Sequence, residues 1–198
     1  MGQGLTETVL RARRLRDSRR NREAHALLTE ALKDAEATIG QGHPAVVDGI
    51  LQLAWVCFGM GDVEGAGSWF REARGRVSKF SPIWMAGAIY HEALFHHRLG
   101  KREECDRLLV TGAGIIQESV PRDSEVALLL FKAVIRILVQ LGRRHLVRTF
   151  AKLGAETEMV LQVRSSEGAA QTCCNPAIQF VALQLDELAH RTEDSRLL

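Results

Sequence analysis

The chain has 198 residues, which is enough for one domain with a sizeable core. Its hydrophobic fraction of 46% and its charged fraction of 25% are those of an ordinary soluble globular protein. The most apolar stretch, residues 126–141, is interrupted by Lys132, Arg136 and Gln140, which argues against a membrane span. The first residues lack the apolar run of a signal peptide, so we expect a cytoplasmic protein.

The net charge of +2 hides an uneven distribution of charge along the chain. Residues 11–22 hold seven arginines and one aspartate, so the remainder carries 26 − 7 = 19 basic and 24 − 1 = 23 acidic residues. One local basic stripe is therefore the strongest electrostatic feature of the sequence.

Helix is the favoured secondary structure, because the chain has only four prolines and one tyrosine and is rich in Ala, Leu and Arg. The clearest pattern lies in residues 42–73, where two amphipathic segments meet at a glycine-rich turn, residues 59–62. Apolar residues recur at spacings of three and four on both sides of this turn: Val47, Ile50, Leu51, Ala54 and Phe58 before it, and Ala66, Phe70 and Ala73 after it. The pattern predicts a helical hairpin, which cannot bury its apolar face without neighbours.

The same reasoning predicts further helices along the whole chain. They span residues 4–17, 21–38, 44–59, 62–77, 82–98, 101–117, 122–141 and 143–163. Residues 164–175 are predicted to form a loop, and a last helix is expected from Pro176 to about Arg191. We expect this last helix to cover the open end of the structure, since terminal units of a repeat array need a cap.

A packing pattern recurs along the predicted second helices. A small or medium-sized residue follows each turn, with further packing residues four and seven positions later. The four first positions are Ala24, Ala66, Cys105 and Val147, at separations of 42, 39 and 42 residues. In the last copy, the positions four and seven residues later are Ala151 and Gly154. The spacing indicates four consecutive helical repeats.

These repeats resemble the tetratricopeptide (TPR) family in its kinesin-light-chain-like form, over residues 5 to about 160. The best copy runs from Gly42-His43-Pro44-Ala45-Val46 through Ala73, although Glu92 and Arg11 replace the usual Leu in the third and first copies. The resemblance implies an all-α, right-handed α-solenoid of about four TPR-like hairpins plus a C-terminal capping helix. Residues 1–163 would form the repeat domain, and residues 164–198 the loop and capping helix of the same domain.

No catalytic group of residues emerges from the sequence, and no cofactor or metal is expected. His91 and His96 are five residues apart on a predicted helix and so diverge, unlike the paired histidines of a zinc-binding helix. The adjacent Cys173 and Cys174 lack the spacing of a metal or redox motif. We therefore expect a protein that is not an enzyme.

The resemblance also implies that the first helix of each repeat lines a concave groove that binds peptide. The residues at these positions are Val9, Arg13, Arg16, Asp48, Leu51, Trp55, Phe58, Tyr90, Leu94, His97, Arg98, Leu129, Lys132, Arg136 and Gln140. Independently of the family, Lys132, Arg136 and Gln140 share one face of an otherwise apolar helix. Basic and aromatic side chains together suit an acidic peptide or a carboxylate. The alternative is that these basic residues pair with neighbouring helices or are simply solvated.

The sequence therefore predicts a protein–protein interaction module: an adaptor, scaffold or regulatory sensor that binds a peptide or partner protein, including an acidic one, in a basic and aromatic groove. Nucleic-acid binding through residues 11–22 is an alternative, although this stripe lacks aromatic residues. A regulatory fragment of a larger protein and a homo-oligomer also remain open. Trp69 and Trp84 are expected to pack between repeats, and Trp55 to contact the ligand.

Overall fold

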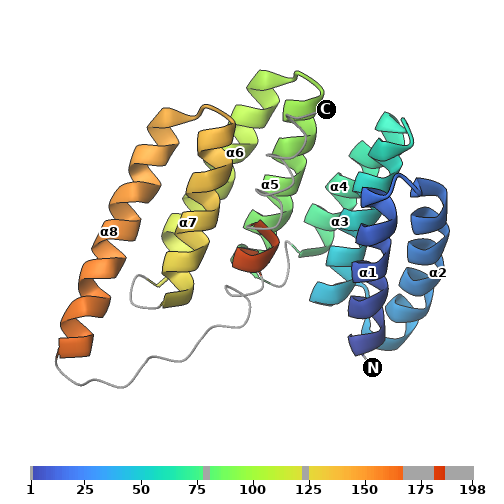
Figure 1. Ribbon diagram of the computed structural model, residues 1–198, viewed down its shortest axis with the longest axis horizontal. Coiled ribbons are helices and arrows are strands. Elements are labelled where there is room, and N and C mark those ends of the chain that lie inside the picture. Colours follow the sequence, from blue (N-terminus) through green and yellow to red (C-terminus); the bar gives the residue numbers. More distant parts are fainter. Residues whose placement is uncertain (1, 78–80, 122–124, 167–180, 186–198) are drawn as a thin grey trace.

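The computed structural model describes residues 2–77, 81–121, 125–166 and 181–185, and within these ranges it contains helices and no strand. The eight long helices are α1 (Gly2–Asp17), α2 (Asn21–Ile39), α3 (Pro44–Gly59), α4 (Val63–Val77), α5 (Pro82–Arg98), α6 (Arg102–Ser119), α7 (Glu125–Gln140) and α8 (Arg144–Ser166). They form four helical hairpins that stand side by side in a row (Figure 1). The predicted all-α architecture of four hairpins is confirmed.

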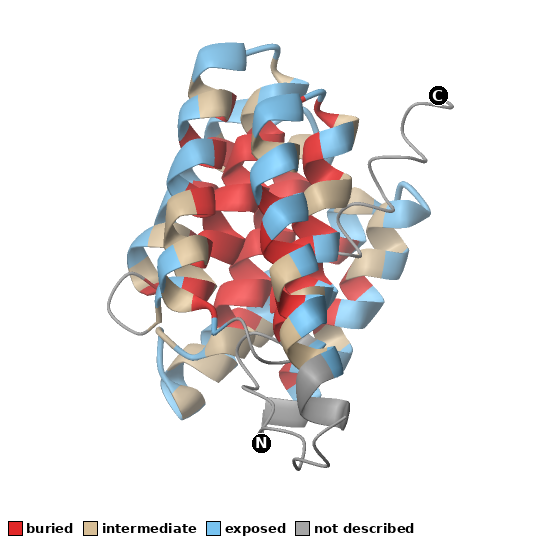
Figure 2. Ribbon diagram, turned by 90° about the vertical axis from the view of Figure 1, so that its left-hand side faces the viewer, coloured by how far each residue is buried: buried red, intermediate tan, exposed pale blue. Residues whose placement is uncertain are grey.

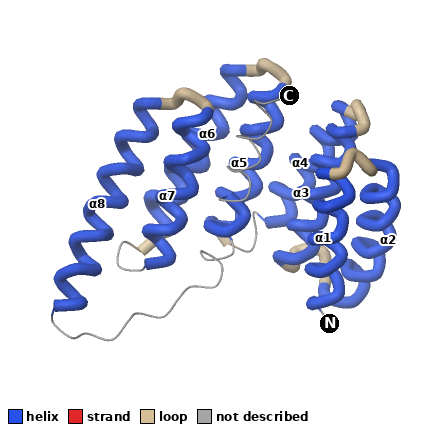
Figure 3. The backbone as a smooth tube through the Cα atoms, in the orientation of Figure 1, coloured by secondary structure: helices blue, strands red, loops and turns tan. Residues whose placement is uncertain are grey.

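The turn inside each hairpin has the same backbone geometry. Gly61, Gly100 and Gly142 have φ angles of 84°, 70° and 70°, and they follow the first helix of hairpins two, three and four. The left-handed region favours glycine, because a Cβ atom clashes there with the backbone. In the first hairpin Arg19 takes this place, with a φ angle of 60°. A residue in the left-handed region, glycine in three of the four cases, therefore marks each turn within a hairpin. Figure 3 shows these short turns between the helices.

The helices begin and end close to the predicted positions. Pro44 and Pro82 each open a helix, as expected of a residue with no N–H to leave unpaired. At α3 the side chain of His43 also accepts a hydrogen bond from the Ala45 N–H, at 3.2 Å. Helix α8 extends to Ser166, three residues into the predicted loop.

Buried residues gather along the middle of the row, and the outer helix faces are exposed (Figure 2). Three of the four predicted repeat positions, Ala24, Ala66 and Cys105, have no exposed surface. The register predicted for the fourth copy is wrong, because Ala151 is exposed while Phe150 is fully buried. Among the described helices α8 packs mainly on α7, so this contact decides which of its faces is buried. Within the described residues, no helix is both long and apolar enough to cross a membrane.

Ion pairs connect consecutive hairpins. Their partners are Arg13–Asp48 and Arg76–Glu36 between hairpins one and two, Arg74–Glu92 between two and three, and Arg143–Asp106 between three and four. Glu92 replaces the usual Leu of the third copy, and it is 4% exposed. Burial raises the pKa of its carboxyl, and the charge of Arg74, at 3.3 Å, opposes that shift. The carboxyl of Glu92, at a position where the family usually has Leu, is therefore paired with Arg74 on the preceding helix.

Two glycines of α6 should respond in opposite directions to the same substitution. A Cβ atom at Gly112 would lie 2.8 Å from Cε2 of Tyr90, a ring with no exposed surface, whereas one at Gly114 would meet nothing within 4 Å. We expect Gly114→Ala to raise the free energy of unfolding by up to about 1 kcal/mol through helix propensity. We expect Gly112→Ala to lower it by about 1–3 kcal/mol through overpacking. Urea denaturation of both variants measures the difference, and equal shifts would contradict the close approach of α5 and α6.

The described part of the predicted last helix, residues 181–185, does not lie where a cap was expected. It is helical and packs against α5, in the middle of the row (Figure 1). Cγ1 of Val181 lies 3.2 Å from the position that a Cβ atom would take at Gly87. The predicted capping position at the end of α8 is thus wrong for these residues, because Gly87 leaves room on α5 for an apolar side chain. The rest of the predicted helix lies outside the described residues.

Candidate functional site

The inner face of the solenoid is built by the first helix of each hairpin: α1, α3, α5 and α7. The structure sorts the predicted binding residues on this face into three groups. Some form a buried polar cluster between α1, α3 and α5. Others belong to the apolar core. A third group, at the end of α5 and along α7, is accessible to a partner.

The buried polar cluster ties α1 to α3. Nη2 of Arg13 donates to both carboxylate oxygens of Asp48, at 2.8 and 3.0 Å. Nη1 of Arg16 donates to Oε1 of Gln52 at 3.0 Å, and Nε2 of Gln52 donates to Asp48 at 3.2 Å. The side chains of Arg13 and Asp48 are only 11% and 8% exposed. The two arginines therefore have partners inside the protein, which is the alternative that the sequence left open.

Trp55 and His91 extend this cluster towards α5. The indole Nε1–H of Trp55 donates to Nδ1 of His91 at 2.9 Å, so in the neutral ring Nε2 carries the proton. Nε2 is buried and has no hydrogen-bond partner. Burial, together with the charges of Arg13 and Arg16, lowers the pKa of His91 to about 3. The guanidinium of Arg98 lies 5.6 Å from the centroid of the Trp55 ring, so this tryptophan is covered on one side by a cation.

The depressed pKa of His91 gives stability a defined pH dependence. Below about pH 6.5 the unfolded chain gains a proton on this imidazole, whereas the native state stays neutral down to a pKa of about 3. His91 therefore contributes stability that is present above about pH 6.5 and is lost as the pH falls towards 3. Between about pH 7 and pH 5, we expect the wild type to lose about 2 kcal/mol more than His91→Gln. Urea denaturation at the two pH values measures this, and parallel losses would contradict a buried neutral His91.

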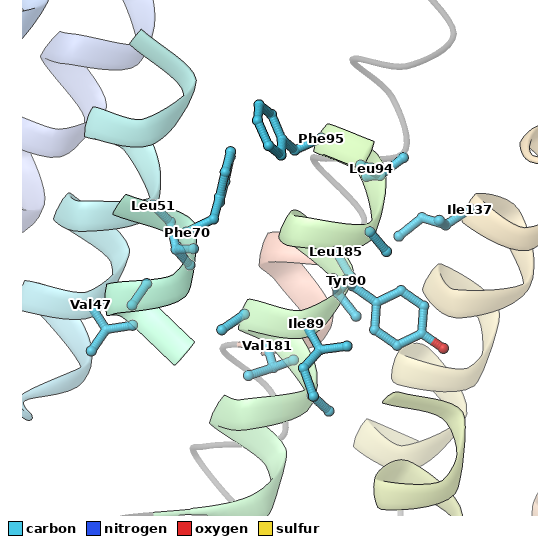
Figure 4. Close-up of a cluster of buried hydrophobic side chains, with 14 of the residues drawn as sticks. Val47, Leu51, Phe70, Ile89, Tyr90, Leu94, Phe95, Ile137, Val181 and Leu185 are labelled. Atoms are coloured by element: carbon cyan, nitrogen blue, oxygen red, sulfur yellow. The ribbon is translucent and has the colours of Figure 1, made fainter. Parts of the chain in front are cut away.

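Several predicted groove residues belong to the apolar core. Tyr90 and Leu94 have no exposed surface, and Leu51 and Val9 are 2% exposed. Tyr90, Leu94 and Leu51 form one cluster with Val181 and Leu185 (Figure 4). Phe58 is half-buried and makes edge-to-face contacts with Trp55 and Phe95. A partner cannot reach Tyr90, Leu94 or Leu51 in this arrangement.

The accessible part of the inner face runs along α7. Leu129 and Val139 are 54% and 59% exposed, Lys132 is exposed, and Arg136 is half-buried. These four residues, the α7 stripe, follow one another at i, i+3, i+7 and i+10 and so share one face of the helix. Gln140 is half-buried beyond them, and His97 and Arg98 are exposed at the end of α5. Val139 was missed by the sequence reasoning, although its spacing from Leu129 places it on the same face.

The basic segment of residues 11–22 is divided by the fold. Arg13 and Arg16 contact α3, whereas the other five arginines are exposed, and one of these, Arg20, is paired with Glu23. A phosphate backbone would therefore meet a smaller set of arginines than the sequence count indicates.

The other residues considered in the sequence analysis are the candidate metal ligands, the cysteines, Trp69 and Trp84. Within the described residues, no group of three or more His, Cys, Asp and Glu side chains could hold a metal ion. Cys57 and Cys105 are buried free thiols, and burial raises the pKa of both. Trp69 and Trp84 are half-buried and pack on the core. Cys173 and Cys174 lie outside the described residues.

Comparisons with known proteins bear on the fold. No protein-family model matches the sequence, and no curated protein matches it. Among solved structures, it is similar to the nearly identical TPR-like repeats of a Podosopora anserina protein described as a kinesin light chain, with a TM-score of 0.54 and 16% identity over 100% of this chain and 90% of that one. A crystal structure of a point variant of that protein matches equally well, over 99% and 89% of the two chains. The four hairpins, their turn glycines and these structural matches show that the chain has the α-solenoid fold of kinesin-light-chain-like TPR repeats.

Proposed function

We propose that the chain is a non-enzymatic protein-interaction module that binds an acidic peptide, or an acidic segment of a partner protein, along the α7 stripe. The observation that carries this proposal is the accessibility of Leu129, Lys132 and Val139 on the inner face of a repeat fold. Single exposed aliphatic residues are common on protein surfaces, but here two of them flank a basic centre on one helix face.

The chemistry of the stripe indicates the ligand. Leu129 and Val139 lie ten residues apart, or about 15 Å along a helix at 1.5 Å per residue. Lys132 lies between them, and Arg136 is on the same face. A ligand with two apolar side chains and one or more carboxylates between them would match this order. Lys132 would contribute mainly to orientation and association rate, and the two apolar contacts mainly to affinity.

The repeat fold gives this stripe a rigid support. Ala127, Leu130, Val134 and Ile137 point into the core from the opposite side of α7 and have no exposed surface. The stripe can therefore be changed without altering the side chains that hold α7 in place. Adaptor, scaffold and regulatory-sensor roles are all compatible with such a module, and the identity of the ligand would decide between them.

A peptide selection with matched variants tests the proposal. A displayed random peptide library is selected on the wild type, and the selected peptides are titrated against Leu129→Asp/Lys132→Glu. The control is Val110→Asp/Lys152→Glu, which makes the same type of change at exposed sites on α6 and α8. We expect acidic peptides whose affinity falls at least about tenfold in the stripe variant and stays within about twofold in the control. Peptides without acidic residues, or with equal affinity for both variants, would contradict it.

A further inference from the structure

The first hairpin carries exposed arginines that the fold does not use. Of the seven arginines in residues 11–22, two contact α3 and one, Arg20, is paired with Glu23 at 2.6 Å. The other four are exposed, and within the described residues their guanidinium groups make no hydrogen bond or ion pair: Arg11, Arg14, Arg19 and Arg22. These four groups are therefore available to a partner.

The acidic residues of the same segment do not cancel this charge. Asp17 lies 3.6 Å from Arg16, and Glu23 is held by Arg20, so both carboxylates are already paired. The hydrogen bond from Arg20 lowers the pKa of the Glu23 carboxyl, and the charge of Arg11 on α1 acts in the same direction. Arginines of α1 and α2 therefore share one basic surface. We call it the arginine surface, and its members are Arg11, Arg14, Arg19, Arg20 and Arg22.

Arg19 stands where the other three hairpins have glycine. Its φ angle of 60° lies in the left-handed region, where a side chain costs conformational free energy that glycine avoids. Within the described residues, no hydrogen bond or ion pair of its side chain offsets this cost. A strained residue without a structural role of this kind points to a function outside the fold.

The chemistry of the arginine surface indicates phosphate groups as the ligand. Every basic residue of residues 11–22 is an arginine, whose planar guanidinium binds two phosphate oxygens at once. Residues 19–23 and Met60 line a shallow hollow of about 370 Å³, which is large enough to admit a phosphate group. The segment has no aromatic residue on which an unpaired base could stack, so a double helix is favoured over a single strand.

A lipid bilayer matches this surface less well. An interfacial helix inserts an apolar face into the membrane. The apolar face of α1 is turned into the core instead, since Leu5, Val9 and Ala12 are buried, and Leu10 is its one large apolar residue that is exposed. Arginines from α1, from the turn and from α2 also surround the end of a hairpin, a shape that suits the phosphates on both sides of a groove.

We infer that the arginine surface binds the phosphate backbone of a nucleic-acid duplex without reading its sequence. Contacts to phosphates position a protein on the double helix and carry no sequence information. This activity goes beyond the proposed peptide binding and is independent of it, because the first hairpin and α7 lie towards opposite ends of the row (Figure 1). With about four phosphates neutralised, the logarithm of the binding constant should fall against the logarithm of the salt concentration with a slope of about −4.

The salt dependence of duplex binding tests this inference. The full chain is titrated into a labelled mixed-sequence DNA duplex of about 20 base pairs, at about 30 to 150 mM salt, and anisotropy is measured. Arg11→Gln/Arg14→Gln should make the slope shallower by about 2 and weaken binding at the lowest salt by at least about tenfold. The matched control, Arg148→Gln/Lys152→Gln, removes the same two charges from exposed sites on α8 and should stay within about twofold of the wild type.

Arg19→Gly separates a role in binding from a role in the fold. Glycine relieves the strain of the left-handed turn, so we expect the midpoint of thermal unfolding to rise. Binding of the duplex should nevertheless weaken at least about threefold, because one phosphate contact is lost. A residue that served only the fold would not show these opposite changes.

Equal slopes for the wild type and Arg11→Gln/Arg14→Gln would overturn the inference, as would an equal loss of binding in the α8 control. Unchanged duplex binding by Arg19→Gly would also overturn it. So would tighter binding of a single strand than of the duplex. Binding to vesicles of phosphatidylcholine with about one fifth phosphatidylserine, without binding to the duplex, would assign the arginine surface to a membrane and overturn the inference in the same way.

Discussion

Asp48→Ala is expected to lower the free energy of unfolding by about 3–5 kcal/mol, because it leaves the buried guanidinium of Arg13 without its counter-charge. Arg13 donates twice to this carboxylate, and Gln52 donates to it as well, so three hydrogen bonds are lost together. The side chain of Arg13 is 11% exposed, so water cannot readily replace them. Urea denaturation followed by circular dichroism measures the loss.

The exposed pair Arg20–Glu23 is the matched control. Its side chains are 58% and 56% exposed, so Glu23→Ala should cause a much smaller loss of stability than Asp48→Ala does. The double variant Arg13→Met/Asp48→Leu should recover most of the stability lost in Asp48→Ala, since apolar residues can replace a buried ion pair. A loss in Asp48→Ala no larger than in the exposed control would show that the pair does not hold α1 on α3.

Phe70→Ala is expected to lower the free energy of unfolding by about 3–5 kcal/mol, the usual cost of emptying a buried aromatic site. Phe70 has no exposed surface, and its ring centroid lies 5.0 Å from that of Trp55 and 5.1 Å from that of Phe95. Phe70 comes from α4 and Phe95 from α5 (Figure 4). Trp55 comes from α3. Its removal should therefore loosen the joint between hairpins two and three.

Thermal and urea denaturation give the size of this effect, and tryptophan fluorescence reports on the surroundings of Trp55. Phe58→Ala removes a half-buried ring that also touches Trp55 and Phe95, so it serves as a control. We expect less than half of the Phe70 effect there, because the site is partly hydrated before the change. A Phe70→Ala variant as stable as Phe58→Ala would contradict a close-packed joint.

The distribution of charge over the inner face changes what a ligand would meet. Arg13 and Arg16 supply hydrogen bonds to Asp48 and Gln52, so the inner face of the first two repeats is a structural joint. The third repeat is covered by residues 181–185, and the fourth presents the α7 stripe. Recognition on this face is therefore proposed to concentrate in the second half of the solenoid.

The hairpins follow from local patterns in the sequence. The spacings of three and four around the turn at residues 59–62 placed α3 and α4, and the predicted starts at residues 44 and 82 fall on the prolines that open α3 and α5. These features are local, since a helix period and a left-handed turn depend on neighbours within one or two turns of chain. The resemblance to TPR repeats then supplied the arrangement of the hairpins, which the structural matches confirm.

The accessibility of the inner-face residues depends on packing between segments that are distant in the sequence. Arg13 and Lys132 are both basic residues predicted for the inner face, yet Arg13 is buried against Asp48 and Lys132 is exposed. Residues 181–185 show the helix period in the sequence, but nothing local indicates that Gly87, far away in the chain, is their seat. The shifted register of α8 has the same origin, because Phe150 is buried by the contact with α7. Periodicity gives the face of a helix, whereas the neighbour that covers that face is set by contacts distant in sequence.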